Sequence, residues 1–294
     1  GIGGGALATN TTGASNVAIG RNALLANTTA SSNTAVGASA LGANTTGGNN
    51  TAVGTGALVA NTTGTANAAL GQTTLTTNTT GSFNSGFGRD SLGLNTTGGN
   101  NTAVGESALY ANTTASNNTA VGKSAGVAVT TGVRNVLIGS LSADALTDAD
   151  DNVAVGDNAL GSDTLGSKST AIGQGALFAQ NFTSATDSYN TAVGYNAGAA
   201  VTTGAQNTLI GGLAGDALED ADANVAIGKG ALTTDRLGSY SVAVGFAALE
   251  AQIFTSATNS YNTAVGAAAG ASVTTGIQNT LIGSLAGDAL TTGE

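Results

Sequence analysis

The chain has no His, Cys, Pro, Met or Trp, and charged residues make up only 8% of it. Without imidazole or thiol groups it has no His base, no Cys nucleophile and no soft metal ligand. These absences exclude most hydrolytic, redox and zinc chemistry, and we expect a protein that is not an enzyme. Disulfide bonds are excluded as well, which is compatible with an extracellular location without indicating one.

Basic residues are also scarce: 7 Lys and Arg stand against 17 Asp and Glu, for a formal net charge of -10. No basic stripe is present to neutralise phosphates, so we expect no nucleic-acid partner. Polar residues or Gly interrupt every apolar run before the roughly 18 residues that a membrane helix needs, so we expect no membrane insertion by this segment. Because the chain starts at Gly1 and stops within its repeat, we interpret it as a processed or incomplete piece.

What the chain has in abundance is Gly, 46 of 294 residues, arranged in a repeat. A five-residue block of Asn or Ser, a Thr or Val in most copies, a small residue, a bulky apolar residue and Gly recurs sixteen times. The copies follow one another every 17 residues, apart from two steps of 21. They begin at Asn16, Asn33, Asn50, Asn67, Asn84, Asn101, Asn118, Asn135, Asn152, Ser169, Asn190, Asn207, Asn224, Ser241, Asn262 and Asn279. A fixed period of this kind predicts a repeat architecture.

A second, longer period divides the chain into two regions. The longer pattern leads from Asn118 to Asn190 and then, by the same step, to Asn262. Residues 1–117 are therefore a run of plain 17-residue repeats. Residues 118–294 continue them as 72-residue super-repeats, each made of three 17-residue coils and one 21-residue coil.

Within one repeat the residues indicate two short strands and two turns. Thr34-Ala35-Val36 alternates with the period of a strand, and the Gly that follows favours a bend. A second strand is expected at Ala40-Leu41, followed by an Asn-Thr-Thr-Gly turn. The density of Gly, Thr and Asn disfavours helix throughout. These features predict an all-β, parallel β-solenoid with 17-residue coils.

Such a thin coil buries few large side chains, which favours packing against further copies of the chain. The small residue at the centre of the strand, Ala35 or Ala52 for example, would allow another chain to approach closely. We therefore expect self-association.

The motifs carry a family resemblance over nearly the whole chain. Asn16-Val17-Ala18-Ile19-Gly20 and its copies at Asn152 and Asn224 resemble the head repeats of YadA-type trimeric autotransporter adhesins. The longer form, with Ala-Leu and Asn-Thr-Thr-Gly after the block, is similar to repeats of phage tail fibres. The resemblance implies a left-handed β-roll and a homotrimeric fibre. The YadA head repeat is shorter than the repeat of this chain, so the turn after the second strand must differ.

The same resemblance implies an extracellular, non-enzymatic structural or adhesive protein that mediates attachment. Its location would be a cell surface or a virion fibre, and its partners would be itself and a host-cell surface glycan or protein receptor. This segment shows no stalk heptads, membrane anchor or chaperone domain, so surface adhesin and tail-fibre shaft both remain open.

Two acidic clusters lie one long period apart. The first contains Asp144 and the second contains Asp216 and Glu219, and the candidate metal ligands are Asp148, Asp150, Asp151, Asp220 and Asp222. Carboxylates in a turn can hold Ca²⁺, and we consider no other cofactor. The alternative is a solvated turn that keeps a weakly charged protein soluble.

The two 21-residue coils carry insertions, Phe182 to Tyr189 and Phe254 to Tyr261. Because loops tolerate insertions and tend to carry function, these four aromatic residues are the candidate receptor contacts. Alternatively, the aromatic residues seal the edge of the coil or a seam between chains.

Asn-Thr-Thr recurs from Asn10 to Asn112 and matches the glycosylation sequon, but stacked coils would turn the same spacing into Asn and Thr ladders. The Thr array also leaves a self-assembling filament or an ice-binding solenoid as alternatives, although adjacent Thr residues in a strand face opposite ways.

A solenoid acyltransferase is disfavoured because that class has 18-residue coils and commonly uses His. The Gly122-Lys123-Ser124-Ala125-Gly126 elbow motif likewise lacks a His partner.

Overall fold

The computed structural model describes residues 1–293, in two compact units, Gly1–Asp148 and Ala149–Glu294. The chain is an all-β, parallel β-solenoid of about sixteen coils that follow the 17-residue period, and residues 1–293 contain no helix. The predicted fold class is thus confirmed at the level of a parallel solenoid. The change of repeat pattern at residue 118 falls inside the first unit.

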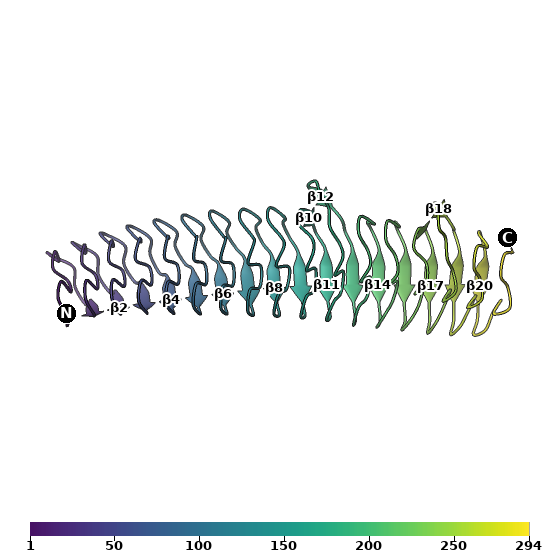
Figure 1. The fold of residues 1–294 in the computed structure, drawn as a ribbon, viewed down its shortest axis with the longest axis horizontal. Coiled ribbons are helices and arrows are strands. Elements are labelled where there is room, and N and C mark those ends of the chain that lie inside the picture. Colours follow the sequence, from purple (N-terminus) through teal and green to yellow (C-terminus); the bar gives the residue numbers. More distant parts are fainter. Residues whose placement is uncertain (294) are drawn as a thin grey trace. The chain divides into compact units, whose positions relative to one another are not determined.

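The first unit contributes one three-residue strand per coil. The strands pair in parallel in chain order, with register partners such as Thr34 and Thr51 that occupy the same place in successive repeats. Figure 1 shows these strands side by side. They are β1 (Val17–Ile19), β2 (Thr34–Val36), β3 (Thr51–Val53), β4 (Ala68–Leu70), β5 (Ser85–Phe87), β6 (Thr102–Val104), β7 (Thr119–Val121) and β8 (Val136–Ile138).

The second unit repeats this arrangement and adds two small sheets. Its main strands are β9 (Val153–Val155), β11 (Thr170–Ile172), β13 (Thr191–Val193), β14 (Thr208–Ile210), β15 (Val225–Ile227), β17 (Val242–Val244), β19 (Thr263–Val265) and β20 (Thr280–Ile282). They pair in parallel in that order. At the two longer coils, β10 (Gly166–Ser167) pairs with β12 (Thr186–Asp187), and β16 (Gly238–Ser239) pairs with β18 (Thr258–Asn259).

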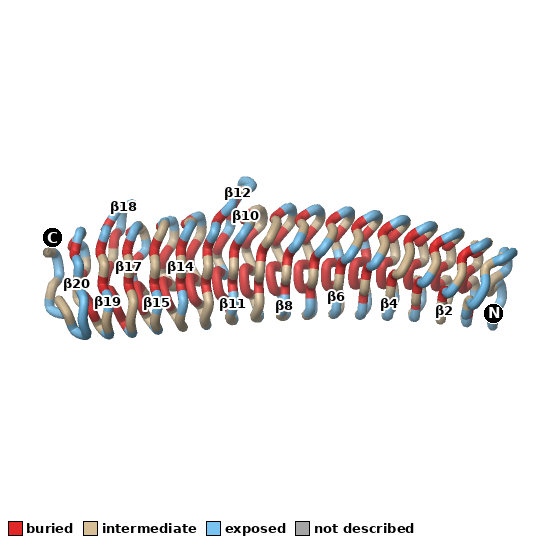
Figure 2. Tube along the Cα trace, turned by 180° about the vertical axis from the view of Figure 1, so that it is seen from behind, coloured by how far each residue is buried: buried red, intermediate tan, exposed pale blue. Residues whose placement is uncertain are grey.

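The small residue at the strand centre points into the coil. Ala35 and Ala52 are fully buried, whereas the residues on either side of each lie at least partly on the surface. Figure 2 shows the same alternation of buried and exposed residues along each coil. The expectation that these alanines leave room for another chain is therefore wrong, because the period-2 geometry of a strand turns them towards their own core.

The predicted second strand is also wrong. Ala40 and Leu41 lie in a turn, both are fully buried, and Leu41 has a positive φ of 51°. Successive residues of a strand face opposite ways, so two adjacent buried side chains require a bend instead. The turn still bonds to the next coil, since the Leu41 amide donates to the Ala57 carbonyl oxygen at 3.0 Å.

The Gly that ends each block forms a corner where neighbouring coils nearly touch. Gly54 has a φ of 138°, and a Cβ atom there would lie 2.2 Å from the carbonyl oxygen of Gly71 in the next coil. Both the backbone conformation and the lack of space exclude a side chain, as the recurrence of Gly suggested.

A ladder of buried Asn side chains fills another corner of the coils in the first unit. Asn44 Nδ2 donates to Asn27 Oδ1 at 3.0 Å, and Asn61 Nδ2 donates to Asn44 Oδ1 at 2.9 Å. The predicted Asn ladder is confirmed, and the asparagines from Asn27 onwards have no exposed surface. The folded chain therefore hides these sequons from a glycosylating enzyme.

This ladder ends where the super-repeats begin. The coil after Asn112 has Val129 in the same place, and no group of the described residues donates to the buried Asn112 Oδ1. Packing changes at the same point. Gly126 takes the place that Leu109 has in the preceding coil, and Leu137, at the strand centre where earlier coils mostly have Ala, fills the space. A Cβ at Gly126 would lie 2.5 Å from Leu137 Cδ1. The 72-residue period is thus a period of core packing.

Candidate functional site

The outer face of the main strands carries an apolar column in each unit. We use outer apolar column for the third residue of every main strand, which follows the buried central residue. In the first unit it includes Ile19, Val53, Leu70, Phe87, Val104, Val121 and Ile138, each between 36% and 41% exposed. In the second unit it includes Ile172, Ile210, Ile227 and Val265, each about as exposed. Exposed apolar residues in register along a sheet face are typical of an interaction surface.

The two phenylalanines proposed as receptor contacts lie in the interior. Phe182 and Phe254 are each only 6% exposed. Their amides donate to Asp163 Oδ1 and Asp235 Oδ1, at 3.1 and 3.0 Å. These two predicted contacts are therefore wrong. The alternative, that the aromatic ring seals the coil, fits both phenylalanines, because each ring is the buried apolar anchor of an inserted loop.

The two tyrosines of the insertions, by contrast, are on the surface. Tyr189 is 53% exposed and Tyr261 is 52% exposed. The Lys168 ammonium lies 5.2 Å from the centre of the Tyr189 ring and forms an ion pair with Asp187 at 2.5 Å. These tyrosines remain predicted contact residues, now as the exposed ends of anchored loops.

Sequence reasoning missed two partners of these tyrosines, Lys168 and Tyr240. Tyr240 stacks on Tyr261 with 5.4 Å between ring centroids and 21° between ring planes. Lys168 and Tyr240 each come directly before the Ser that opens the block of their coil, so the repeat alignment contained the signal. Both partners precede the insertion in the chain, and stacking of coils brings them beside it.

A buried polar network holds each insertion. Gln180 Nε2 donates to Asp163 Oδ2 at 2.6 Å and to Ser169 Oγ at 2.8 Å. The Gln180 amide oxygen accepts from Asn190 Nδ2, and the Ser169 and Ser188 hydroxyls lie 2.5 Å apart. Asp235 and Gln252 form the same contacts one super-repeat later. The fully buried position of Asp163 raises its pKa, although the hydrogen bonds from Gln180 and from backbone amides partly oppose this.

Asp163 and Gln180 occupy the place that Asn takes in the ladder of the first unit. The sequence repeat shows that Asn is replaced at this position. It does not show that Asp163 and Gln180 bond to each other, because only the stacking of coils brings these two side chains together.

The acidic residues proposed as metal ligands bond to neighbouring coils. Asp148 Oδ1 accepts from Thr131 Oγ1 at 2.6 Å, and Asp220 Oδ1 accepts from Thr203 Oγ1 at 2.8 Å. Asp222 Oδ1 accepts from the Ala205 amide at 2.8 Å. Asp150 and Asp151 are half-buried, and the Asp150 amide donates to Ser167 Oγ. Within residues 1–293 no group of three or more acidic side chains is placed to hold a metal ion, so a Ca²⁺ site finds no support within one chain.

Within the same residues the structure has no helix that is long and apolar enough to cross a membrane. No protein-family model, curated protein or solved structure matches the chain.

Proposed function

We propose that this chain is the shaft of an extracellular, non-enzymatic fibre that mediates attachment, as a surface adhesin or a phage tail fibre. Its coils are left-handed and three copies form the fibre, as the resemblance of the repeat implies. The observation that carries the proposal is the outer apolar column, which leaves one face of each unit's sheet without a partner within a single chain.

The column supports association because its residues lie in register on successive strands. Val104 pairs with Val121 across β6 and β7, and each is more than one third exposed. Burying the remaining third of such a side chain contributes about 0.5–1 kcal/mol, a third of the roughly 1.5–3 kcal/mol for full burial. Because the column repeats on every coil, many small contributions add up along one face.

The solution mass of the folded chain tests the proposal. We expect three times the 27.8 kDa of one chain by analytical ultracentrifugation. A triple variant, Val53→Lys, Val104→Lys and Val121→Lys, places charge on the column and is expected to sediment as a monomer. The matched control, Thr46→Lys, Thr63→Lys and Thr97→Lys, adds the same charge at exposed corner residues and is expected to remain trimeric. A compact wild-type monomer would overturn the fibre proposal.

Attachment is tested separately on glycan and receptor arrays. Because Phe182 and Phe254 hold the loops in place, the informative change is at the exposed tyrosines. We expect Tyr189→Ala and Tyr261→Ala to reduce binding without changing the solution mass. Unchanged binding would remove the loops from the contact surface.

An ice-binding role is the second candidate, and a Thr row gives it a basis. The second Thr of each Asn-Thr-Thr is exposed. The first is half-buried from Thr28 onwards and bonds to the next coil, as Thr45 Oγ1 does with the Thr62 carbonyl oxygen. The exposed row is Thr12, Thr29, Thr46, Thr63, Thr80, Thr97 and Thr114. It lies at a bend and not on a strand. Thermal hysteresis in the wild type that is lost in Thr63→Lys would favour ice binding over the shaft.

A further inference from the structure

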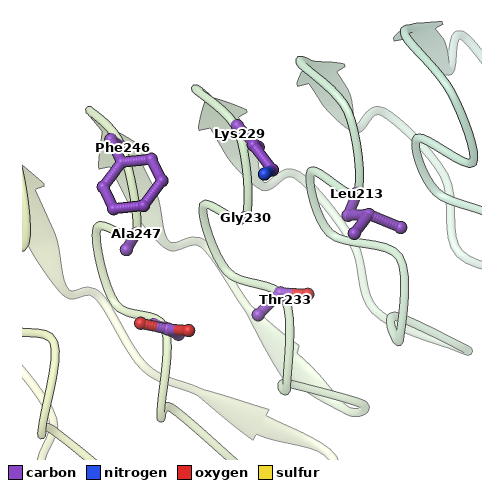
Figure 3. Close-up of a pocket in the computed structure, with 7 residues that line it drawn as sticks. Leu213, Lys229, Gly230, Thr233, Phe246 and Ala247 are labelled. Atoms are coloured by element: carbon purple, nitrogen blue, oxygen red, sulfur yellow. The ribbon is translucent and has the colours of Figure 1, made fainter.

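A pocket of about 240 Å³ lies on the second unit, on a different part of the coils from the outer apolar column. Leu213, Lys229, Thr233, Phe246 and Glu250 contribute the side chains of its wall, and Gly230 and Ala247 complete it. Figure 3 shows Phe246, Lys229 and Leu213 on three neighbouring coils. The volume is below the roughly 300–1,000 Å³ of pockets for drug-sized ligands, so the pocket suits one small ring.

The pocket exists because one side chain is missing. Gly230 lies between Leu213 and Ala247, which occupy the same place in the coils before and after it. A Cβ atom at Gly230 would meet no atom within 4 Å. Gly230 has a φ of 67°, while Leu213 and Ala247 have φ values of 59° and 53°. Leu and Ala adopt this left-handed φ in the neighbouring coils, so position 230 can carry a side chain at the cost of that strained conformation, and Gly leaves the space open.

The wall combines an apolar surface with groups that both donate and accept hydrogen bonds. The Phe246 ring is 61% exposed. Among the described residues, neither the Lys229 ammonium nor the Glu250 carboxylate is part of an ion pair. Lys229 can donate, Glu250 can accept, and the Thr233 hydroxyl, which donates to Asp216, still has lone pairs to accept with.

We propose that this pocket binds one uncharged sugar ring of a surface glycan. The C–H face of the ring packs against Phe246, its hydroxyls donate to Glu250 and Thr233, and another of its oxygens accepts from Lys229. The charges of Lys229 and Glu250 cancel, so the ligand needs several hydroxyls and no net charge. The proposal deepens the attachment function on which it rests, and it places a contact outside the aromatic loops.

Binding of the methyl glycosides of glucose, galactose, mannose and N-acetylglucosamine tests the proposal, followed on the full chain by isothermal titration calorimetry and saturation-transfer NMR. We expect at least one glycoside to bind saturably. Gly230→Leu fills the pocket with the residue found at position 213 and is expected to abolish binding. Lys229→Gln removes a charged donor and is expected to weaken binding about tenfold or more.

The matched control is Lys123→Gln, at the same position of a coil in the first unit, and it should leave binding unchanged. Failure of all four glycosides to bind overturns the proposal. So does binding that survives Gly230→Leu, equal binding of cyclohexanol, or binding of phenylalanine in place of the glycosides. The solution mass is measured on the same samples: a trimer without glycoside binding overturns only the pocket, and a monomer that binds overturns only the fibre.

Discussion

The Asn ladder of the first unit ends at Asn112, whose side-chain oxygen has no donor among the described residues, and this difference from interior positions allows a quantitative prediction. Asn61 sits within the ladder: its Nδ2 donates to Asn44 Oδ1, and its Oδ1 accepts from Asn78 Nδ2 at 2.8 Å. Asn112 sits at the end: its Nδ2 donates to Asn95 Oδ1 at 2.6 Å, but none of the described residues donates to its own Oδ1. The same substitution by Ala therefore removes different sets of hydrogen bonds at the two sites.

Counting the groups left without partners gives the size of the difference. Asn61→Ala leaves the Asn44 oxygen and one N–H of Asn78 without a hydrogen-bond partner. Asn112→Ala leaves the Asn95 oxygen without a partner, but it also removes the Asn112 oxygen that was already unpaired, so the number of unpaired buried groups does not rise. Each unpaired buried group costs about 1–3 kcal/mol, so Asn61→Ala should lower the free energy of unfolding by about 2–6 kcal/mol more than Asn112→Ala.

Urea unfolding followed by circular dichroism measures the overall difference. Because repeat proteins unfold locally, amide hydrogen exchange on the coils beside each site is the companion measurement. Asn78→Ala, another interior position, should behave like Asn61→Ala. Equal costs at Asn61 and Asn112, or a larger cost at Asn112, would refute the account of the ladder as a chain of obligatory amide contacts.

Three further predictions concern the corner, the loop anchor and the buried carboxyl group. Gly54→Ala should cost at least 2–3 kcal/mol or so, because its Cβ meets backbone at 2.2 Å, whereas Gly56→Ala, with its nearest neighbour at 3.7 Å, should cost about 1 kcal/mol for its left-handed φ; thermal unfolding compares the two. Phe182→Ala should cost about 3–5 kcal/mol as a buried large-to-small change and speed hydrogen exchange in the insertion, and little effect on either would contradict its role as an anchor. Since burial raises the pKa of Asp163, the folded state holds this proton at pH values where the unfolded chain has released it. The contribution of Asp163 to stability is therefore greatest below its unfolded pKa of about 3.9 and is lost as pH rises through the folded pKa. Asp163→Asn should remove that part of the slope in unfolding titrations carried upward from about pH 3.

The period of the sequence determined the fold. Sixteen blocks ending in Gly at nearly constant spacing allow few arrangements other than stacked coils, because each block needs the same corner and the same neighbour. The Asn ladder followed for the same reason: a spacing of one coil places Asn44 beside Asn61. The composition alone also pointed away from His- and Cys-dependent chemistry.

Tertiary structure decided which way each side chain points. Nothing in the sequence distinguishes Ala35 from an alanine on the surface, and only the folded coil places its side chain in the core. Leu41 follows Ala40 as it would in a strand, but both reach the core because the backbone takes a left-handed conformation that sequence pattern does not reveal. Phe182 and Tyr189 delimit one insertion, yet one anchors it and the other faces solvent. The gap at Gly230 depends on residues from three coils. The spacing of residues along the chain determines which residues become neighbours in successive coils. The φ and ψ angles of each residue determine whether its side chain faces the core or the solvent.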